Sequence, residues 1–238
     1  MREFLKTGLV LMIITTIAGL GLALVYNLVK EPIEKAELAA KIDAIRFVLT
    51  DSVTGNLLVP ETEIPEDGKA LAKYEWTPMP SEEGIMYSST TWKGKVQSPA
   101  YIFETKDGKK VYVLTGQAVG YGGNVVSVAA FLTTPQGLKL NAIKVMEYSQ
   151  ETPGLGANIA RDDIQKRFYP IASEGLEKGL KVNKDAGIIV PSNELQRARD
   201  TEGVVQTSDV MTGATITPRA VVNSINTMYE FLKKAGVK

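Results

Sequence analysis

The residues best suited to bind a phosphate lie in a short turn near the C-terminal end of the chain. Residues 209–217 read DVMTGATIT, with three threonine hydroxyls around the small residues Gly213 and Ala214. Small side chains allow the backbone to approach a ligand closely. If a helix follows, its free N–H groups and the positive end of its dipole favour an anion. The pattern therefore fits a phosphate-binding turn, although a plain capping turn would have the same pattern.

Two other turns contain residues that could lie against a planar ring. Residues 151–156 read ETPGLG, and residues 120–123 read GYGG just before an expected strand. Pro and Gly make a stiff turn with an uncovered backbone, which suits contact with a flat group. Taken alone, each segment is typical of an ordinary structural loop.

The composition restricts the chemistry open to this chain. Its 238 residues include no Cys and no His, and 27 Lys plus Arg balance 27 Asp plus Glu. Without thiolates or imidazoles, iron–sulfur clusters, c-type haem, blue copper, the usual zinc sites, disulfides and His-dependent triads are excluded. Zero formal net charge offers no basic surface to nucleic acid. We expect no metal site, no nucleic-acid partner and, for redox work, an organic cofactor.

An apolar segment near the N-terminus is long enough to cross a membrane. Residues 8–29 carry no charged side chain, and about 20 such residues span a bilayer. The segment exceeds the roughly 7–15 apolar residues of a signal peptide, and no A-x-A cleavage site follows. Lys and Arg are nearly balanced across it, and the N-terminal amine favours a cytoplasmic position for residues 1–7. We expect a single-pass protein of the cytoplasmic (inner) membrane, with residues 31–238 outside the cytoplasm.

The remainder of the chain is expected to form an α+β domain. Residues 30–50 have helical spacing and predict a membrane-proximal helix, whereas residues 51–100 are expected to be a linker and peripheral segment. The main domain would then occupy residues 101–238. Runs of strands and helices without βαβ alternation predict an antiparallel sheet with flanking helices. The expected strands are 101–104, 111–117, 125–132 and 138–145.

Helices are expected mainly in the C-terminal third of the chain. Short ones are predicted at 162–168 and 193–199, and a longer amphipathic helix covers 218–234. Thr217 is the expected N-cap of this longer helix, with Pro218 at the first helical position. The phosphate-binding turn would then lie directly before the helix N-terminus.

Three segments together resemble a known family of flavoproteins. Asp209-x-x-Thr-Gly-Ala-Thr215 matches the flavinylation motif of the FMN-binding domain found in the G subunit of the Rnf complex. The same motif occurs in the C subunit of the sodium-pumping NADH:quinone reductase. A chance match of its five fixed positions is on the order of 10⁻³ or less at average composition. The ETPGLG and GYGG segments are similar to the family's turns beside the flavin, and the resemblance covers the anchor and residues 101–238.

The resemblance implies a covalent cofactor. In the family, a flavin transferase with FAD as donor joins the phosphate of FMN to the last Thr of the motif, here Thr215. Asp209 is expected to be recognised by that transferase. The other residues expected to bind the cofactor are Thr212, Gly213, Ala214, Ile216, Thr217, Glu151, Thr152, Gly154, Leu155, Gly156, Tyr121, Gly122 and Gly123.

One position departs from the family pattern. Many members have His two residues before the Glu of ETPGLG, and this chain has Ser149 there. Any proton-handling role of that His is therefore absent, while the flavin attachment does not use it.

The function implied by the resemblance is that of an electron-relay subunit without a catalytic site of its own. The Rnf complex couples electron transfer between reduced ferredoxin and NAD to sodium or proton movement, so the implied partners are its membrane and iron–sulfur subunits. The C subunit of the quinone reductase is the alternative with the same chemistry. A cofactor-free binding module, or a hydrolase that uses Glu147 and Glu151, is the alternative from another class.

Overall fold

The N-terminal helix is continuous over an unexpectedly long stretch. The computed structural model describes residues 1–237 as two units, which divide after Ala40. Helix α1 (Arg2–Val48) contains Pro32 in its interior, so the expected membrane span and membrane-proximal helix form one element. By length and composition α1 can cross a membrane, and the apolar side chains of residues 8–29 are exposed.

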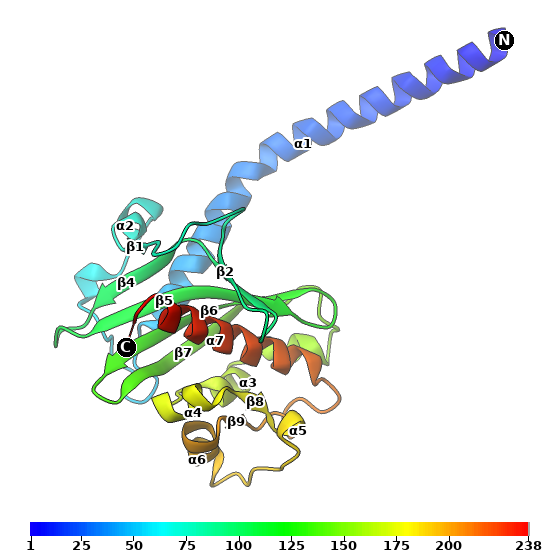
Figure 1. The fold of residues 1–238 in the computed structure, drawn as a ribbon. Coiled ribbons are helices and arrows are strands. Elements are labelled where there is room, and N and C mark those ends of the chain that lie inside the picture. Colours follow the sequence, from blue (N-terminus) through cyan, green and yellow to red (C-terminus); the bar gives the residue numbers. More distant parts are fainter. Residues whose placement is uncertain (238) are drawn as a thin grey trace. The chain divides into compact units, whose positions relative to one another are not determined.

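The second unit is built on a seven-stranded antiparallel sheet (Figure 1). Strand β5 is central: it pairs with β6 along one edge, and its other edge pairs first with β4 and then with β3. Strand β7 continues the sheet beyond β6. The four expected strands and the α+β class are confirmed. The strands are β1 (Glu75–Trp76), β2 (Ile85–Ser88), β3 (Gly94–Gln97), β4 (Ala100–Glu104), β5 (Lys110–Val119), β6 (Asn124–Thr134) and β7 (Gly137–Glu147).

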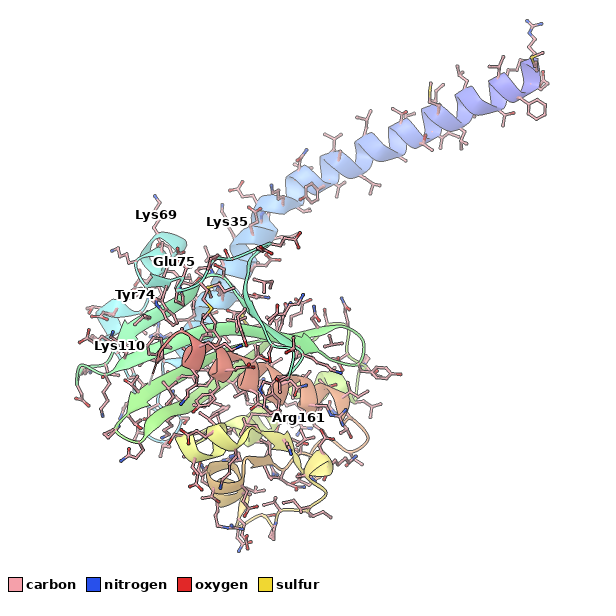
Figure 2. All side chains as sticks on the ribbon, in the orientation of Figure 1. Lys35, Lys69, Tyr74, Glu75, Lys110 and Arg161 are labelled. Atoms are coloured by element: carbon pink, nitrogen blue, oxygen red, sulfur yellow. The ribbon has the colours of Figure 1, made fainter. Side chains whose placement is uncertain are left out.

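Residues 51–100 contribute more to this sheet than the sequence indicated. Beside η1 (Glu61–Glu63) and α2 (Gly68–Ala72), they form β1, β2 and β3, which pair with neighbouring strands. Tyr74 stacks on Phe103 of β4 with ring centroids 4.4 Å apart, at the edge where Figure 2 labels Tyr74 and Glu75. These strands are too short for a periodic signal, and partners far along the chain stabilise them.

Helix α7 (Ile216–Lys234) covers one face of the sheet and packs against β3, β5 and β6 (Figure 1). Its apolar face is the expected one, because Val221, Ile225, Met228 and Leu232 are all buried. Burying such side chains is the main stabilising contribution of an amphipathic helix. The helix therefore has a fixed position on the sheet, and its N-terminus is a firm support for the residues before it.

A layer of short elements joins β7 to α7. The expected helix at 162–168 is confirmed as α3 followed by η3, whereas the one at 193–199 begins later and continues into a π-helical turn. The side chain of Asn226 on α7 hydrogen-bonds both backbone groups of Leu180 in this layer, at 2.8 and 2.9 Å. The elements are η2 (Gly156–Ala160), α3 (Asp162–Gln165), η3 (Lys166–Phe168), α4 (Ser173–Lys178), β8 (Lys181–Val182), α5 (Asn183–Ala186), α6 (Leu195–Arg197), η4 (Ala198–Glu202) and β9 (Val204–Val205), with β8 and β9 parallel.

An ion pair links the first turn of α7 to α5. The Arg219 guanidinium donates to both carboxylate oxygens of Asp185, at 2.6 and 2.5 Å. These hydrogen bonds lower the pKa of the Asp185 carboxyl from its usual 3.8. A lowered folded-state pKa adds stability above the unfolded-state pKa, and that stability is lost as pH falls through the folded-state value.

We therefore expect Asp185→Asn to reduce stability at neutral pH by about 0.2–1 kcal/mol, as for other exposed ion pairs. The difference from the parent should shrink as pH falls below about 4. Thermal unfolding over that pH range measures it, with Asp43→Asn as control at an exposed carboxylate that has no ion pair among the described residues. An Asp185→Asn deficit that is constant with pH would show that the charge is not responsible.

Candidate functional site

The motif turn is fixed by one buried side chain and by its own backbone. Met211 is buried, its N–H donates to the carbonyl of Thr207 (2.8 Å), and its carbonyl accepts from the N–H of Ala214 (3.2 Å). Gly213 has a φ of 84°, in the left-handed region that favours glycine. The turn thereby delivers Thr215 to the N-terminus of α7.

Helix α7 begins earlier than the sequence indicated. Thr215 is the N-cap and Ile216 is the first helical residue, so the prediction of Thr217 as N-cap was wrong. Within the described part of the chain the Thr215 side chain makes no capping hydrogen bond, which leaves its hydroxyl free for other chemistry. Pro218 lies within the first turn, where backbone N–H groups have no partner inside the helix and a missing one costs little.

The Glu151 carboxylate joins all three segments that the sequence analysis singled out. Its side chain is only 4% exposed. Oε1 accepts hydrogen bonds from the backbone N–H groups of Tyr121 (2.7 Å) and Gly122 (3.3 Å). Oε2 accepts from the hydroxyl of Thr217, which is 1% exposed. Thr217 thus serves as the partner of Glu151, and one carboxylate holds the GYGG turn, the ETPGLG turn and the start of α7 together.

Glycines allow this close approach. A Cβ at Gly120 would lie 2.2 Å from Oε1 of Glu151, and one at Gly156 would lie 2.3 Å from Oε2. A Cβ at Gly122 would lie 1.7 Å from the carbonyl oxygen of Gln150. Real Cβ atoms never come so near a polar atom, so these positions must lack a side chain. The glycines are required to pack the turns on Glu151.

A cleft of about 360 Å³ opens where the three segments meet. Much of its apolar surface is exposed, because Tyr121 is 71%, Leu155 44% and Ile216 40% accessible. Its polar lining comes from one carboxylate and three threonines. The lining residues are Tyr121, Glu151, Thr152, Leu155, Gly156, Gly213, Ala214, Thr215, Ile216 and Thr217.

Five residues expected at the site lie outside this lining. Gly122 and Gly123 pack on Gln150, and Gly154 is the left-handed residue of its turn, with a φ of 75°. Thr212 is exposed, and its hydroxyl donates to the carbonyl of Ser208 (3.3 Å). The fifth is Asp209, at the start of the motif.

Asp209 is bound to a residue that sequence reasoning missed. Its Oδ2 accepts from Nη2 of Arg167 at 2.8 Å, and its Oδ1 accepts from Nε2 of Gln206 at 3.3 Å. Arg167 belongs to η3, 42 residues earlier in the chain. No motif or spacing around Arg167 marks it, because the contact arises only from the fold.

Two other hollows on the second unit contain none of the expected residues. One of about 790 Å³ lies beside β2 and is lined mainly by polar side chains, among them Glu82, Glu83 and Lys95. Another of about 380 Å³ lies beside β7 and contains Phe47 and Tyr169. Neither has a helix N-terminus with glycine-rich turns around it, so the cleft at Thr215 remains the best candidate for an anion-bearing ligand.

Comparison with known proteins identifies the family of the chain. The FMN-binding domain family matches residues 120–230, which include all three turns. A crystal structure assigned as the RnfG subunit of an electron transport complex from Thermotoga maritima superposes with a TM-score of 0.63. It is 40% identical, and the alignment covers 83% of this chain and 98% of that one.

Two curated relatives are likewise named as G subunits of ion-translocating complexes. The G subunit of the proton-translocating ferredoxin:NAD(+) oxidoreductase complex of Clostridium ljungdahlii is 27% identical over 177 residues, covering 68% of this chain and 80% of the relative. The G subunit of the ion-translocating oxidoreductase complex of Shewanella piezotolerans is 26% identical over 229 residues, covering 94% of this chain and 87% of the relative. With its fold, its three turns and these relatives, the chain belongs to the RnfG family of proteins with an FMN-binding domain.

Proposed function

We propose that this chain is a membrane-anchored flavoprotein component of an Rnf complex, with FMN bonded through its phosphate to Thr215. The observation that carries the proposal is the state of the Thr215 hydroxyl. It lies at a helix N-terminus, makes no capping hydrogen bond and lines the cleft between the three turns. A free hydroxyl in that place can be esterified without loss of a structural contact.

The residues around the cleft fit FMN. Ligand sites are typically clefts of about 300–1,000 Å³ with apolar walls and a few polar groups, and this one has both properties. Tyr121, Leu155 and Ile216 offer exposed apolar surface for a flat ring system. Thr152 and the backbone of Gly156 supply polar groups at the same wall.

The N-terminus of α7 suits the phosphodiester. The N–H groups of Ile216 and Thr217 lie in the first turn, where no earlier helical carbonyl can accept from them. Together with the helix dipole they favour a negative charge by about 0.3–1 kcal/mol at an exposed site.

The attachment is a group transfer with FAD as donor. The Thr215 oxygen forms a bond to the FMN phosphorus, the phosphoanhydride bond of FAD breaks, AMP leaves and the hydroxyl proton is released. Gly213 and Ala214 leave space for the donor beside Thr215. A covalent bond also prevents loss of the flavin by dilution from an open cleft.

Bound FMN supplies a redox centre that can exchange electrons one or two at a time. The chain itself holds and shields the ring, and Glu151 fixes the turns that form its walls. We therefore assign an electron-relay role within the complex and no reaction of its own. Electrons would pass to and from other membrane and iron–sulfur subunits, and a flavin transferase would act once during maturation.

The names of the relatives favour the RnfG assignment over the C subunit of the quinone reductase, because each of them is the G subunit of its complex.

We propose that α1 anchors the chain in the cytoplasmic membrane through residues 8–29 and that the FMN-binding domain faces away from the cytoplasm. The apolar character of that segment supports the anchor. Lys and Arg are nearly balanced across the segment, so the N-terminal amine is the charge that favours this orientation.

The first prediction from the proposed function concerns flavin attachment. Thr215→Ala should give a folded protein without covalent flavin, because the side chain makes no capping hydrogen bond that folding could lose. Thr212→Ala is the comparison variant three residues away and should retain at least some covalent flavin, because the bond is assigned to Thr215. Flavin fluorescence of the denatured protein band in a gel measures covalent flavin, and circular dichroism measures folding. Loss of covalent flavin in Thr212→Ala with full loading in Thr215→Ala would refute the assignment.

A second prediction concerns the ETPGLG turn. Thr152 and Leu155 line the cleft with exposed side chains, so Thr152→Ala and Leu155→Ala should shift the flavin's absorption spectrum or midpoint potential without reducing its covalent loading. Pro153→Ala is a control in the same turn at a residue outside the lining. If Thr152→Ala and Leu155→Ala have the parent's flavin spectrum and midpoint potential, the turn has only a structural role.

A third prediction concerns topology. Protease added to spheroplasts should remove the domain beyond residue 30 and leave the anchor in the membrane, because the domain is expected on the outer side. An antibody against a C-terminal tag follows the cleavage, with a cytoplasmic protein as lysis control. A domain that stays intact until the cells are broken would reverse the orientation.

A further inference from the structure

Among the ion pairs of the described residues, that between Arg167 and Asp209 has the least exposed basic side chain. The side chain of Arg167 is 19% exposed and that of Asp209 is 41% exposed. Nη1 of Arg167 is buried and has no hydrogen-bond partner among the described residues. Asp209 is the carboxylate partner of this guanidinium. Arg167 donates to Oδ2 of Asp209 at 2.8 Å, and the neutral Gln206 amide donates to Oδ1 over a longer distance, 3.3 Å.

The backbone that carries Arg167 is itself held in place. Its carbonyl accepts from Nη1 of the buried Arg199 at 3.0 Å, and the next residue, Phe168, is fully buried. Arg167 therefore extends from a rigid segment to the opening residue of the motif. A hydrogen bond to a charged partner in this setting is stronger than an ordinary exposed one.

Met211, between Asp209 and Thr215 in the chain, is buried, and its backbone hydrogen-bonds those of Thr207 and Ala214, so the segment that carries Asp209 and the modified hydroxyl has a fixed backbone. We infer that Arg167 is a positioning residue for flavin attachment: it holds the Asp209 carboxylate in one orientation, ready for the flavin transferase. This inference rests on the proposed function, in which Asp209 is recognised by that enzyme. A carboxylate that is already held in one orientation loses less conformational entropy when the transferase binds it.

The test uses full-length apo protein in detergent, purified flavin transferase and FAD. The initial rate of covalent flavin incorporation should fall roughly tenfold in Arg167→Met, the order expected from loss of one charge-assisted hydrogen bond. Arg167→Lys should recover part of the rate, because it keeps the charge but not the fork geometry. The control is Arg161→Met, which removes an exposed ion pair to Asp163 in the same layer, has no contact with Asp209 among the ion pairs and hydrogen bonds of the described residues, and should leave the rate unchanged.

A charge swap shows whether flavin attachment needs the carboxylate at position 209 or only an ion pair between the two segments. Arg167→Asp combined with Asp209→Arg keeps an ion pair between the two segments but removes the carboxylate that the transferase would recognise. Its thermal midpoint should recover relative to the single variants, while its flavin incorporation should stay low. Recovery of incorporation in the swap would overturn the inference and leave a structural pair.

Parent-like incorporation in Arg167→Met would also overturn the inference while leaving the proposed function intact. The proposed function fails separately, if parent protein with transferase and FAD acquires no flavin on Thr215. Peptide mapping of the parent reaction distinguishes these two failures.

Discussion

The Glu151 carboxylate is the contact on which the site depends. It receives two backbone N–H groups from the GYGG turn and one hydroxyl from the first turn of α7, and it is almost completely buried. A buried carboxylate is costly unless its oxygens are hydrogen-bonded, and loss of these partners would leave it unsatisfied. The requirement to satisfy Glu151 therefore draws three separate loops into one cleft.

The sheet brings these loops within reach of Glu151. The β5–β6 turn follows the pairing of Val119 with Asn124, and β7 ends where Glu147 pairs with Val126, so both connections leave the same end of the sheet (Figure 1). Helix α7 lies across β3, β5 and β6 and presents its N-terminus at that end. Burial of the α7 apolar face and the long β5–β6–β7 ladder provide the rigid frame, and the glycines let the loops close over it.

The sequence indicated the elements with strong local signals and missed those that depend on distant partners. Strands β4 to β7 and the buried face of α7 follow from apolar periodicity, and the residues around Thr215 follow from the motif. Strands β1 to β3 have only short apolar runs, and they depend on pairing: β1 pairs with β4, β3 with β5, and β2 with β3. Thr217 matched an N-cap pattern, but Glu151 takes its hydroxyl and the helix starts earlier. The partnership of Arg167 with Asp209 has no signal in the sequence, because η3 reaches the motif only after the chain has folded.

Amide hydrogen exchange of the full-length protein in detergent tests the role of Glu151 most directly. In Glu151→Ala, the N–H groups of Tyr121 and Gly122 lose their acceptor, so peptides covering 119–124 and the start of α7 should exchange faster than in the parent. Peptides from β6 and β7 should be unchanged, and Glu151→Gln, which keeps an acceptor oxygen, should resemble the parent. If Glu151→Ala exchanges like the parent at 119–124 and at 215–218, Glu151 does not hold the site together.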